Sequence, residues 1–308
     1  MTNLTKTLKY AKSSWHFAVE VYEEWNEDNC FRLAAALSYY TVFSLAPIIL
    51  IATSIAGAIF GRDAVSGQFY HQMSGMIGAD GAKAIEGLVQ NSYLEKTSLL
   101  GTIIGGATLV LSATVTFSVI QDSLNTIWKV KARPKMGIIR FVLTRVLSFS
   151  MVLGIGFLLM VSLVINTVIV ALEGYIARVL NDFSVYLINI AQVGVSLAVI
   201  TLLFGAMYKF LPDVRISWRK VWKGALLTAV LFTLGKYLIG LYLGHSNLAS
   251  TYGAAASVIV IMLWVNYSSW IFFIGAEYIY VRMRRDGNKI VPNKYAIRLH
   301  IQEVEEEV

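Results

Sequence analysis

One lysine lies deep inside an apolar stretch, where a charged side chain costs free energy. Lys236 stands about 21 Å along a helix from Trp222, where that stretch begins. A lysine at the centre of a membrane helix costs about 2.5–3.5 kcal/mol. Either the side chain snorkels to the nearer interface, or it faces inward, where an unpaired ammonium would attract an anionic group or would lose its proton. Amides at comparable depth are the inward partners, so we predict a substrate or ion pathway that comprises Lys236, Asn166, Asn189, Gln192 and Asn266.

A second group of polar side chains gathers where the apolar stretches end. Glu277 belongs to it and stands about 6 Å inside the end of the last stretch. Opposite charges at equal depth can neutralise one another, so the group is either a structural charge cluster or an inner gate. Both interpretations predict side chains that face the interior of the helix bundle. The members are Arg32, Gln121, Asp122, Asn125, Arg145, Lys209 and Glu277.

The residue types give no support to enzymatic chemistry. Cys30 is the only cysteine, and the sequence has no Walker-type glycine loop for ATP hydrolysis. The four histidines are scattered and form no metal-ligand pattern. We therefore predict a protein that is not an enzyme and that holds no metal and no cofactor. The histidines are His16, His71, His245 and His300.

The composition places these polar residues in a membrane protein. Hydrophobic residues make up 56% of the 308 residues and charged residues 15%, whereas a soluble domain carries about 25% charged residues. Six apolar stretches reach the roughly 20 residues that a membrane-crossing helix needs. The predicted fold is an all-α integral membrane protein with six transmembrane helices. Their approximate ranges are 33–60, 99–120, 138–172, 183–208, 222–243 and 253–281.

The basic residues report the orientation of these helices. On this arrangement, 21 of the 26 lysines and arginines fall on the side that holds both termini, and an excess of basic residues marks the cytoplasmic side. Anionic lipid headgroups account for such charges, and no segment interleaves them with aromatic residues as a nucleic-acid groove would. We predict that both termini are cytoplasmic, that membrane lipids are partners and that nucleic acid is not.

Three regions follow from the spans. Residues 1–32 carry apolar side chains every three or four positions over residues 4–25, which predicts an amphipathic helix that either lies on the inner leaflet or packs against the protein's own cytoplasmic loops. Residues 33–281 form the transmembrane domain, with an outer helical loop at 61–98. Residues 282–308 form a charged cytoplasmic tail, of a kind that is usually solvated and disordered.

Pro47 lies in the middle of the first span. A proline removes one backbone hydrogen bond of a helix, so we predict a kink there. Broken helices often line transport sites, but a kink can also be purely structural.

Four stretches, taken in order and spacing, resemble the YihY/BrkB family of bacterial inner-membrane proteins. The resemblance covers roughly residues 32–281 and implies a six-helix, multi-pass fold in the bacterial inner membrane. It brings no agreed activity, and the ribonuclease label once given to the family has no support in this sequence. The stretches are AAALSYY at 34–40, QDSLNTIW at 121–128, FLP at 210–212 with WR at 218–219 and GA at 224–225, and YG at 252–253 with Trp264 and GAE at 275–277.

Three functions are compatible with these observations. The leading hypothesis is a membrane transporter or translocase for an anionic or amphiphilic substrate, including a lipid-linked one, that works near Lys236. A cation/proton exchanger is the alternative, and it needs Asp122 or Glu277 as its titrating carboxylate. A non-transport scaffold for envelope integrity would bind partners through the outer loop and the N-terminal helix. The sequence is also compatible with an oligomer.

Overall fold

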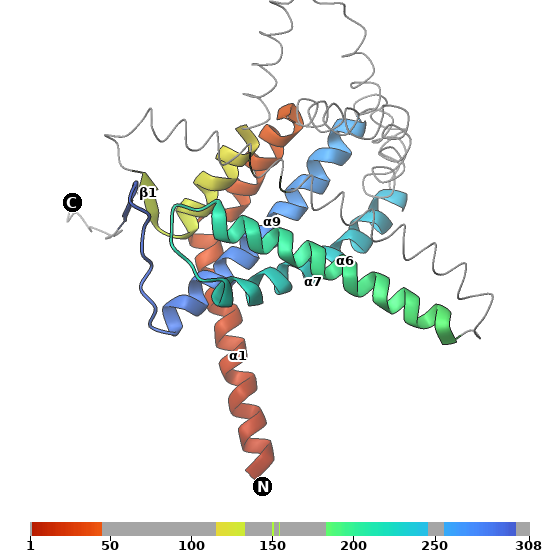
Figure 1. Ribbon diagram of the computed structural model, residues 1–308, viewed down its shortest axis with the longest axis horizontal. Helices are drawn as coiled ribbons and strands as arrows, with labels where there is room; N and C mark the ends of the chain where they lie inside the picture. The colour runs from red at the N-terminus through yellow and green to blue at the C-terminus, as the bar shows by residue number, and fades with distance from the viewer. Residues whose placement is uncertain are drawn as a thin grey trace, which may run out of the picture.

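Helices dominate the computed structural model, which describes residues 2–44, 115–132, 150, 154, 183–245 and 256–299 (Figure 1). Within these residues, three helices are long and apolar enough to cross a membrane. They are α6 (Phe183–Phe210), α7 (Trp218–His245) and α9 (Ala256–Arg285). These helices coincide with the last three predicted spans. The first three predicted spans, Pro47 and the loop at 61–98 lie wholly or largely outside the described residues.

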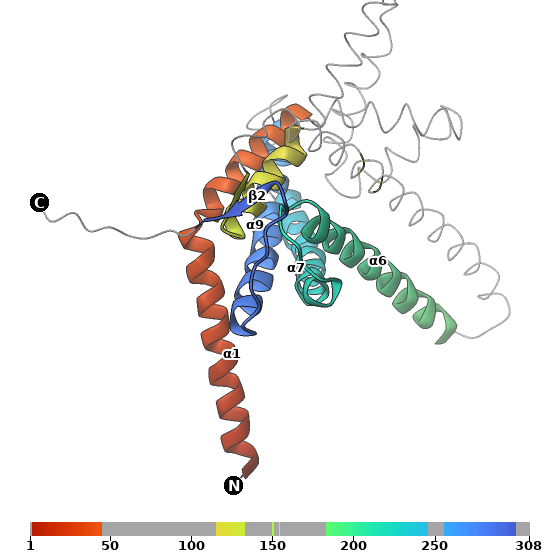
Figure 2. The same cartoon turned by 60° about the vertical axis from the view of Figure 1, so that its left-hand side comes forward.

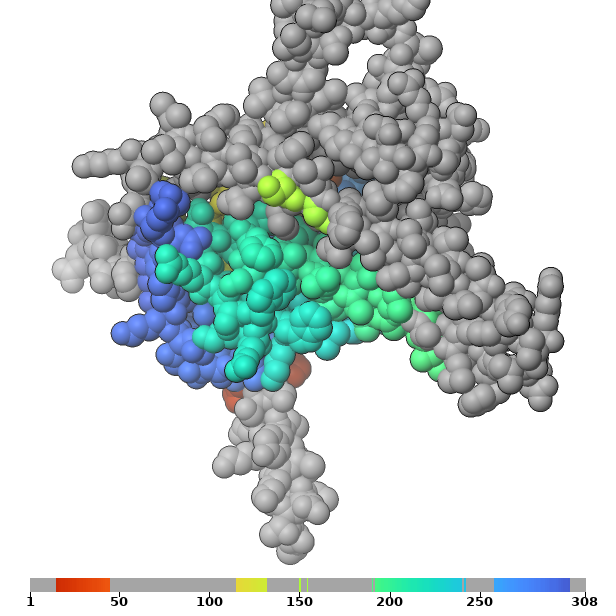
Figure 3. Space-filling view, in the orientation of Figure 1, coloured from red at the N-terminus to blue at the C-terminus, as the bar shows by residue number. Residues whose placement is uncertain are grey.

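The three long helices pack in sequence order, α6 against α7 and α7 against α9. On the face seen in Figure 3, α6 and α7 lie side by side. A close approach between α7 and α9 is built on glycines: a Cβ at Gly224 would overlap Ile279, and a Cβ at Gly275 would overlap Thr228 and Tyr208. Small residues at such crossings let membrane helices approach closely. This contact fixes the position of the α9 segment that carries Glu277.

The helix predicted over residues 4–25 is present as α1 (Thr2–Glu27). A second helix runs over residues 30–44. Between them Asn29 has a φ of 53°, a left-handed conformation that asparagine tolerates better than most residues. The C-terminal half of α1 packs against α9 (Figure 2). In this contact the rings of Phe17 and Tyr278 meet edge to face with centroids 5.1 Å apart.

The C-terminal segment is folded over the ends of the helices. A helix at residues 115–127 leads into strand β1 (Val130–Ala132), which pairs antiparallel with β2 (Ala296–Arg298). A bridge between Val214 and Pro292 ties the same segment to the α6–α7 loop. Residues 282–285 continue α9 and residues 286–299 form this strap, so the described part of the predicted solvated tail is ordered. The sequence pattern predicted no strand.

Candidate functional site

The buried end of α9 carries a carboxylate. Glu277 is completely buried, as are its neighbours Phe273 and Ala276. The thiol of Cys30, the first residue of the 30–44 helix, donates to Glu277 Oε1 at 3.7 Å. A buried carboxylate is costly unless it is paired, protonated or bound to a cation, so the surroundings of Glu277 decide its chemical state.

Two more carboxylates approach Glu277 from the end of α1. Glu24 and Asp28 are both buried, and one oxygen from each of the three groups lies within 4.8 Å of the others. We call Glu24, Asp28 and Glu277 the carboxylate cluster. Asp28 Oδ2 and Glu277 Oε2 are buried and have no hydrogen-bond partner among the described residues. Carboxylates this close cannot all be ionised unless a cation lies between them; otherwise one of them holds a proton.

Lys129 supplies one positive charge to the cluster. Its Nζ lies 2.5 Å from Asp28 Oδ1 and 3.6 Å from Glu24 Oε2. Lys129 is the second residue after the 115–127 helix and has a φ of 52°. Burial lowers the pKa of Lys129, but the hydrogen bond to Asp28 and the charges of Asp28 and Glu24 outweigh it and raise the pKa. For Asp28 burial is the stronger effect, and it raises the pKa despite the ammonium.

Two arginines at the end of α9 hold α1 from outside the cluster. Arg284 donates to Glu24 and to Glu20, the latter at 2.5 Å, and Arg285 pairs with the other oxygen of Glu20 at 2.5 Å. We call these contacts the arginine clamp. Burial raises the pKa of Glu20, but the hydrogen bonds from Arg284 and Arg285 outweigh it and hold the pKa below its ordinary value.

The charges do not balance. The clamp compensates Glu20 and Glu24, and Lys129 compensates Asp28. Glu277 makes no ion pair with any described residue. The cluster therefore needs one further positive charge, and a single proton or monovalent cation would supply it.

A second polar cluster joins the 115–127 helix to the α6–α7 loop. Asn125 Nδ2 donates to Asp213 Oδ2 at 2.9 Å, and the Asp213 amide donates back to Asn125 Oδ1 at 2.8 Å. Gln121 Nε2 donates to Asp213 Oδ1 at 3.2 Å. Gln121 and Asn125 are buried. This reciprocal arrangement, which we call the amide clasp, fixes the loop against the helix that leads to Lys129.

Replacing Asn125 by alanine tests the clasp. The change removes a donor to the Asp213 carboxylate and the acceptor of its amide, and buried hydrogen bonds to charged groups contribute about 1.5–3 kcal/mol. We expect Asn125→Ala to lower the free energy of unfolding by about 2 kcal/mol in detergent micelles. Thr126→Ala is the control: the exposed hydroxyl of Thr126 donates to the Asp122 carbonyl of its own helix at 3.0 Å. Equal losses for both variants would contradict the assignment.

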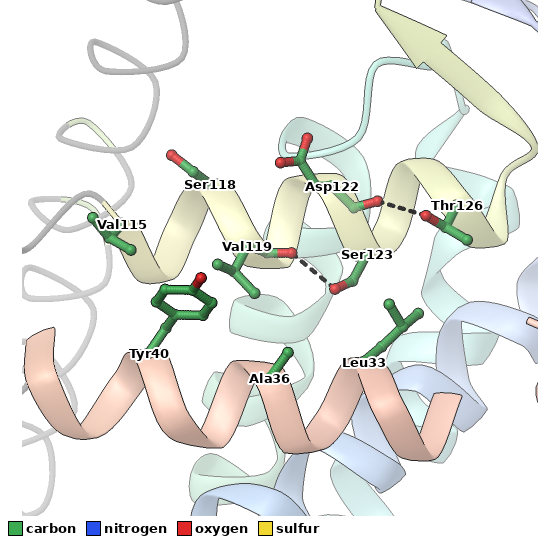
Figure 4. Close-up of a pocket in the computed structure, with 9 residues that line it drawn as sticks. All are labelled: Leu33, Ala36, Tyr40, Val115, Ser118, Val119, Asp122, Ser123 and Thr126. Carbon is green, nitrogen blue, oxygen red and sulfur yellow. Dashed lines mark hydrogen bonds between the residues drawn. The ribbon is translucent and has the colours of Figure 1, made fainter. Parts of the chain in front are cut away.

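A groove of about 450 Å³ lies between the 30–44 and 115–127 helices. The two helices run antiparallel there, with Tyr40 facing Val115 and Val119 (Figure 4). Asp122 lines the groove near its polar end, and its carboxylate points away from the 30–44 helix. The groove is therefore apolar for most of its length and carries one acid. Its lining comprises Leu33, Ala36, Tyr40, Val115, Ser118, Val119, Asp122, Ser123 and Thr126.

Comparison with known proteins assigns the chain to a family. The family model described as virulence factor BrkB matches residues 21–298. The chain belongs to the BrkB family. Curated relatives are called UPF0761 membrane proteins: that of Stenotrophomonas maltophilia (strain K279a) is 28% identical over 269 residues, and that of Acinetobacter baylyi 26% over 294 residues. These alignments cover 86% and 94% of this chain.

The relatives are longer proteins. The chain spans 58% of the Stenotrophomonas relative and 68% of the Acinetobacter relative. No solved structure matches the chain. Family membership and the three apolar helices together make this a membrane protein, as the sequence resemblance implied.

The structure separates the predicted gate residues of this BrkB-family chain into different surroundings. Glu277 joins the carboxylate cluster, and Gln121 and Asn125 form the amide clasp with Asp213. Asp122 and Arg32 are exposed, and Lys209 Nζ donates to the carbonyl of Ile216. Arg145 lies outside the described residues.

Hydrogen bonds do not join the residues of the predicted pathway to Lys236 in the described part of the chain. Lys236 is exposed on α7, with its Nζ 5.7 Å from the ring centroid of Tyr237. Gln192 and Asn266 are half-buried, and neither makes a hydrogen bond to Lys236 in the described part of the chain. Asn189 is part of α6, but its side chain is not described. Asn166 lies outside the described residues.

Sequence reasoning missed most partners of Glu277. Glu24, Asp28 and Lys129 all lie outside the predicted spans, where charged residues are normally solvated. The signals that could have found them were local: Glu24 and Asp28 are four residues apart, a spacing that brings side chains together where a chain is helical, and Lys129 directly follows the QDSLNTIW stretch. Asp213 likewise follows FLP directly.

Proposed function

We propose that this member of the BrkB family is a proton-coupled membrane transporter that works as a cation/proton exchanger at the carboxylate cluster. The observation that carries the proposal is the pair of buried oxygens on Asp28 and Glu277, which lack hydrogen-bond partners among the described residues. A group that must hold either a proton or a cation is suited to exchange one for the other. The excess of basic residues at these ends of the spans supports a position for the cluster on the cytoplasmic side of the membrane.

The charge balance limits the exchange to one charge at a time. One proton leaves the Asp28 and Glu277 pair as one monovalent cation enters, so the net charge of the buried site is unchanged. Lys129 stays paired with Asp28 and Glu24 in both states. A divalent cation would leave the site with an excess positive charge unless the ammonium withdrew.

Proton flux in proteoliposomes tests the proposal. We expect an outward gradient of Na⁺ or K⁺ to drive proton uptake by the wild-type chain and Glu277→Gln to reduce that uptake to the liposome background, because an amide cannot exchange a proton. Asp122→Asn is the matched control, since Asp122 is the other predicted carboxylate and lies on the groove. Full flux in Glu277→Gln would refute exchange at this site.

A second candidate is translocation of an amphiphile, and the open groove with its mostly apolar lining favours it. The Lys236 hypothesis belongs to this candidate. It is supported if Lys236→Met or Asp122→Asn abolishes transport of a fluorescent amphiphile while Glu277→Gln does not. An unchanged rate in both variants would count against translocation along these residues.

A further inference from the structure

We propose that α1 is the gate of the carboxylate cluster: its C-terminal end covers Glu277 in the closed state and swings away to admit water and ions. The functional meaning of this gate rests on the proposed exchange, but the movement can be measured without transport.

One of the three carboxylates, Glu24, belongs to the proposed moving element, and a second, Asp28, adjoins that element at the hinge. Glu24 lies in the last turn of α1 and Asp28 immediately after it, whereas Glu277 is held in α9 by the close α7–α9 crossing. Withdrawal of α1 would therefore divide the cluster and remove the side chains that cover Glu277. Cys30, which is fully buried beside Glu277, would become accessible at the same time.

The chain has a suitable hinge next to the cluster. Two turn residues, Asp28 and Asn29, separate α1 from the helix at 30–44. Asn29 adopts the left-handed conformation, and both its amide and its carbonyl take part in short-range bonds, to Asn26 O at 3.0 Å and from Arg32 N at 2.8 Å. A few residues at the end of an element are enough to absorb a hinge rotation.

The contacts that hold α1 closed combine two buried apolar side chains, Val21 and Trp25, with ion pairs that lie partly at the surface. The arginine clamp attaches Glu20 and Glu24 to α9, and Arg285 also lies over the ring of Phe17 at 5.0 Å. Beyond these contacts the N-terminal half of α1 extends away from the other described helices (Figures 1 and 2). The pairs of Glu20 with Arg284 and Arg285 are the more exposed of these contacts, and exposed pairs contribute little individually and are screened by salt; weakening them should shift α1 toward the open state.

Cys30 provides a built-in reporter, because it is the single cysteine of the chain. The closed protein should react slowly with N-ethylmaleimide, since the thiol is buried and since burial and the charges of Glu277 and Asp28 raise its pKa. We expect Glu20→Gln and Arg285→Gln each to accelerate labelling about fivefold, because each weakens the clamp and exposed pairs have modest energies. Labelling is measured on the purified full chain by intact mass.

Arg282 and Asp286 supply the matched control. They form an exposed pair at 4.0 Å on the same end of α9, so Arg282→Gln should label at the wild-type rate. Added salt should accelerate labelling of the wild type more than that of Glu20→Gln. A wild-type rate in Glu20→Gln would overturn the gate, as would equal acceleration in Arg282→Gln.

A variant that holds α1 closed tests whether general unfolding explains the faster labelling of Cys30. Cysteines introduced by Phe17→Cys and Tyr278→Cys, joined by a short bifunctional thiol reagent, should slow the labelling of Cys30 below the wild-type rate. Unchanged labelling after cross-linking would overturn the proposal. If weakening the clamp accelerates labelling while Glu277→Gln retains full proton flux, the gate stands and the exchanger fails. If labelling stays at the wild-type rate while Glu277→Gln loses its proton flux, the exchanger stands and the gate fails.

Discussion

Lys129→Met is expected to lower the free energy of unfolding by about 3–5 kcal/mol, the cost of removing one partner from a buried ion pair. Methionine fills a similar volume but leaves Asp28 and Glu24 without the ammonium that lies between them. The loss should exceed that of Arg282→Gln, whose exposed partner is Asp286, because exposed pairs contribute about 0–1 kcal/mol. Unfolding by SDS in mixed micelles provides the measurement.

A second substitution should recover much of this loss. Asp28→Asn in the Lys129→Met background removes the carboxylate that the first change left unpaired, so the double variant should be more stable than Lys129→Met alone. A double-mutant cycle then gives the coupling energy of the pair. Additive losses would mean that Lys129 and Asp28 do not stabilise one another.

The loss in the free energy of unfolding caused by Lys129→Met should also depend on pH. Without the ammonium the pKa of Asp28, already raised by burial, should rise further. A carboxyl group with a raised folded-state pKa contributes stability at low pH and loses that contribution as the pH rises through the folded pKa. The difference in the free energy of unfolding between Lys129→Met and wild type should therefore be largest near neutral pH. It should shrink as the solution is acidified toward the ordinary pKa range of carboxyl groups, about pH 4. A pH-independent difference would contradict a charge-based loss.

The elements of this fold were easier to predict than the partners within the site. Apolar length alone locates α6, α7 and α9, because a membrane helix must satisfy its backbone internally and present apolar side chains to lipid. The three-to-four periodicity locates α1. Strands β1 and β2 escaped prediction because each has three residues, and their pairing depends on contacts between distant segments.

Of the carboxylate cluster, residue type predicts Glu277 alone. Glu277 was identified because an acid inside an apolar stretch is expensive. Its partners Asp28 and Lys129 are ordinary charged residues in polar segments, and only the packing of α1 on α9 and the turn after residue 127 bury them. Lys236 satisfied the same sequence criterion as Glu277, yet its side chain is exposed on α7. Depth in a span can be read from sequence, whereas the direction of the side chain depends on helix packing.

The crossing of α7 and α9 leads to the second large effect, which is expected for Gly275→Ala. The added methyl would overlap the hydroxyls of Thr228 and Tyr208. Tyr208 Oη donates to the Phe272 carbonyl at 2.6 Å and lies 2.9 Å from Thr228 Oγ1, so neither hydroxyl can move without losing a buried hydrogen bond. Overpacking a tight core costs about 1–3 kcal/mol, and we expect a loss of about 3 kcal/mol in the same SDS assay.

The control and the rescue for Gly275→Ala come from the same helices. A Cβ added at Gly194 in α6 would meet no atom within 4 Å, so Gly194→Ala should leave the free energy of unfolding nearly unchanged. Thr228→Ala removes one of the two obstructing hydroxyls, and the double variant should lose less stability than the two single losses added together. Since Glu277 follows Gly275 by less than one helical turn, the same displacement should also lower proton flux. Normal stability and normal flux in Gly275→Ala would mean that this crossing does not hold Glu277 in place.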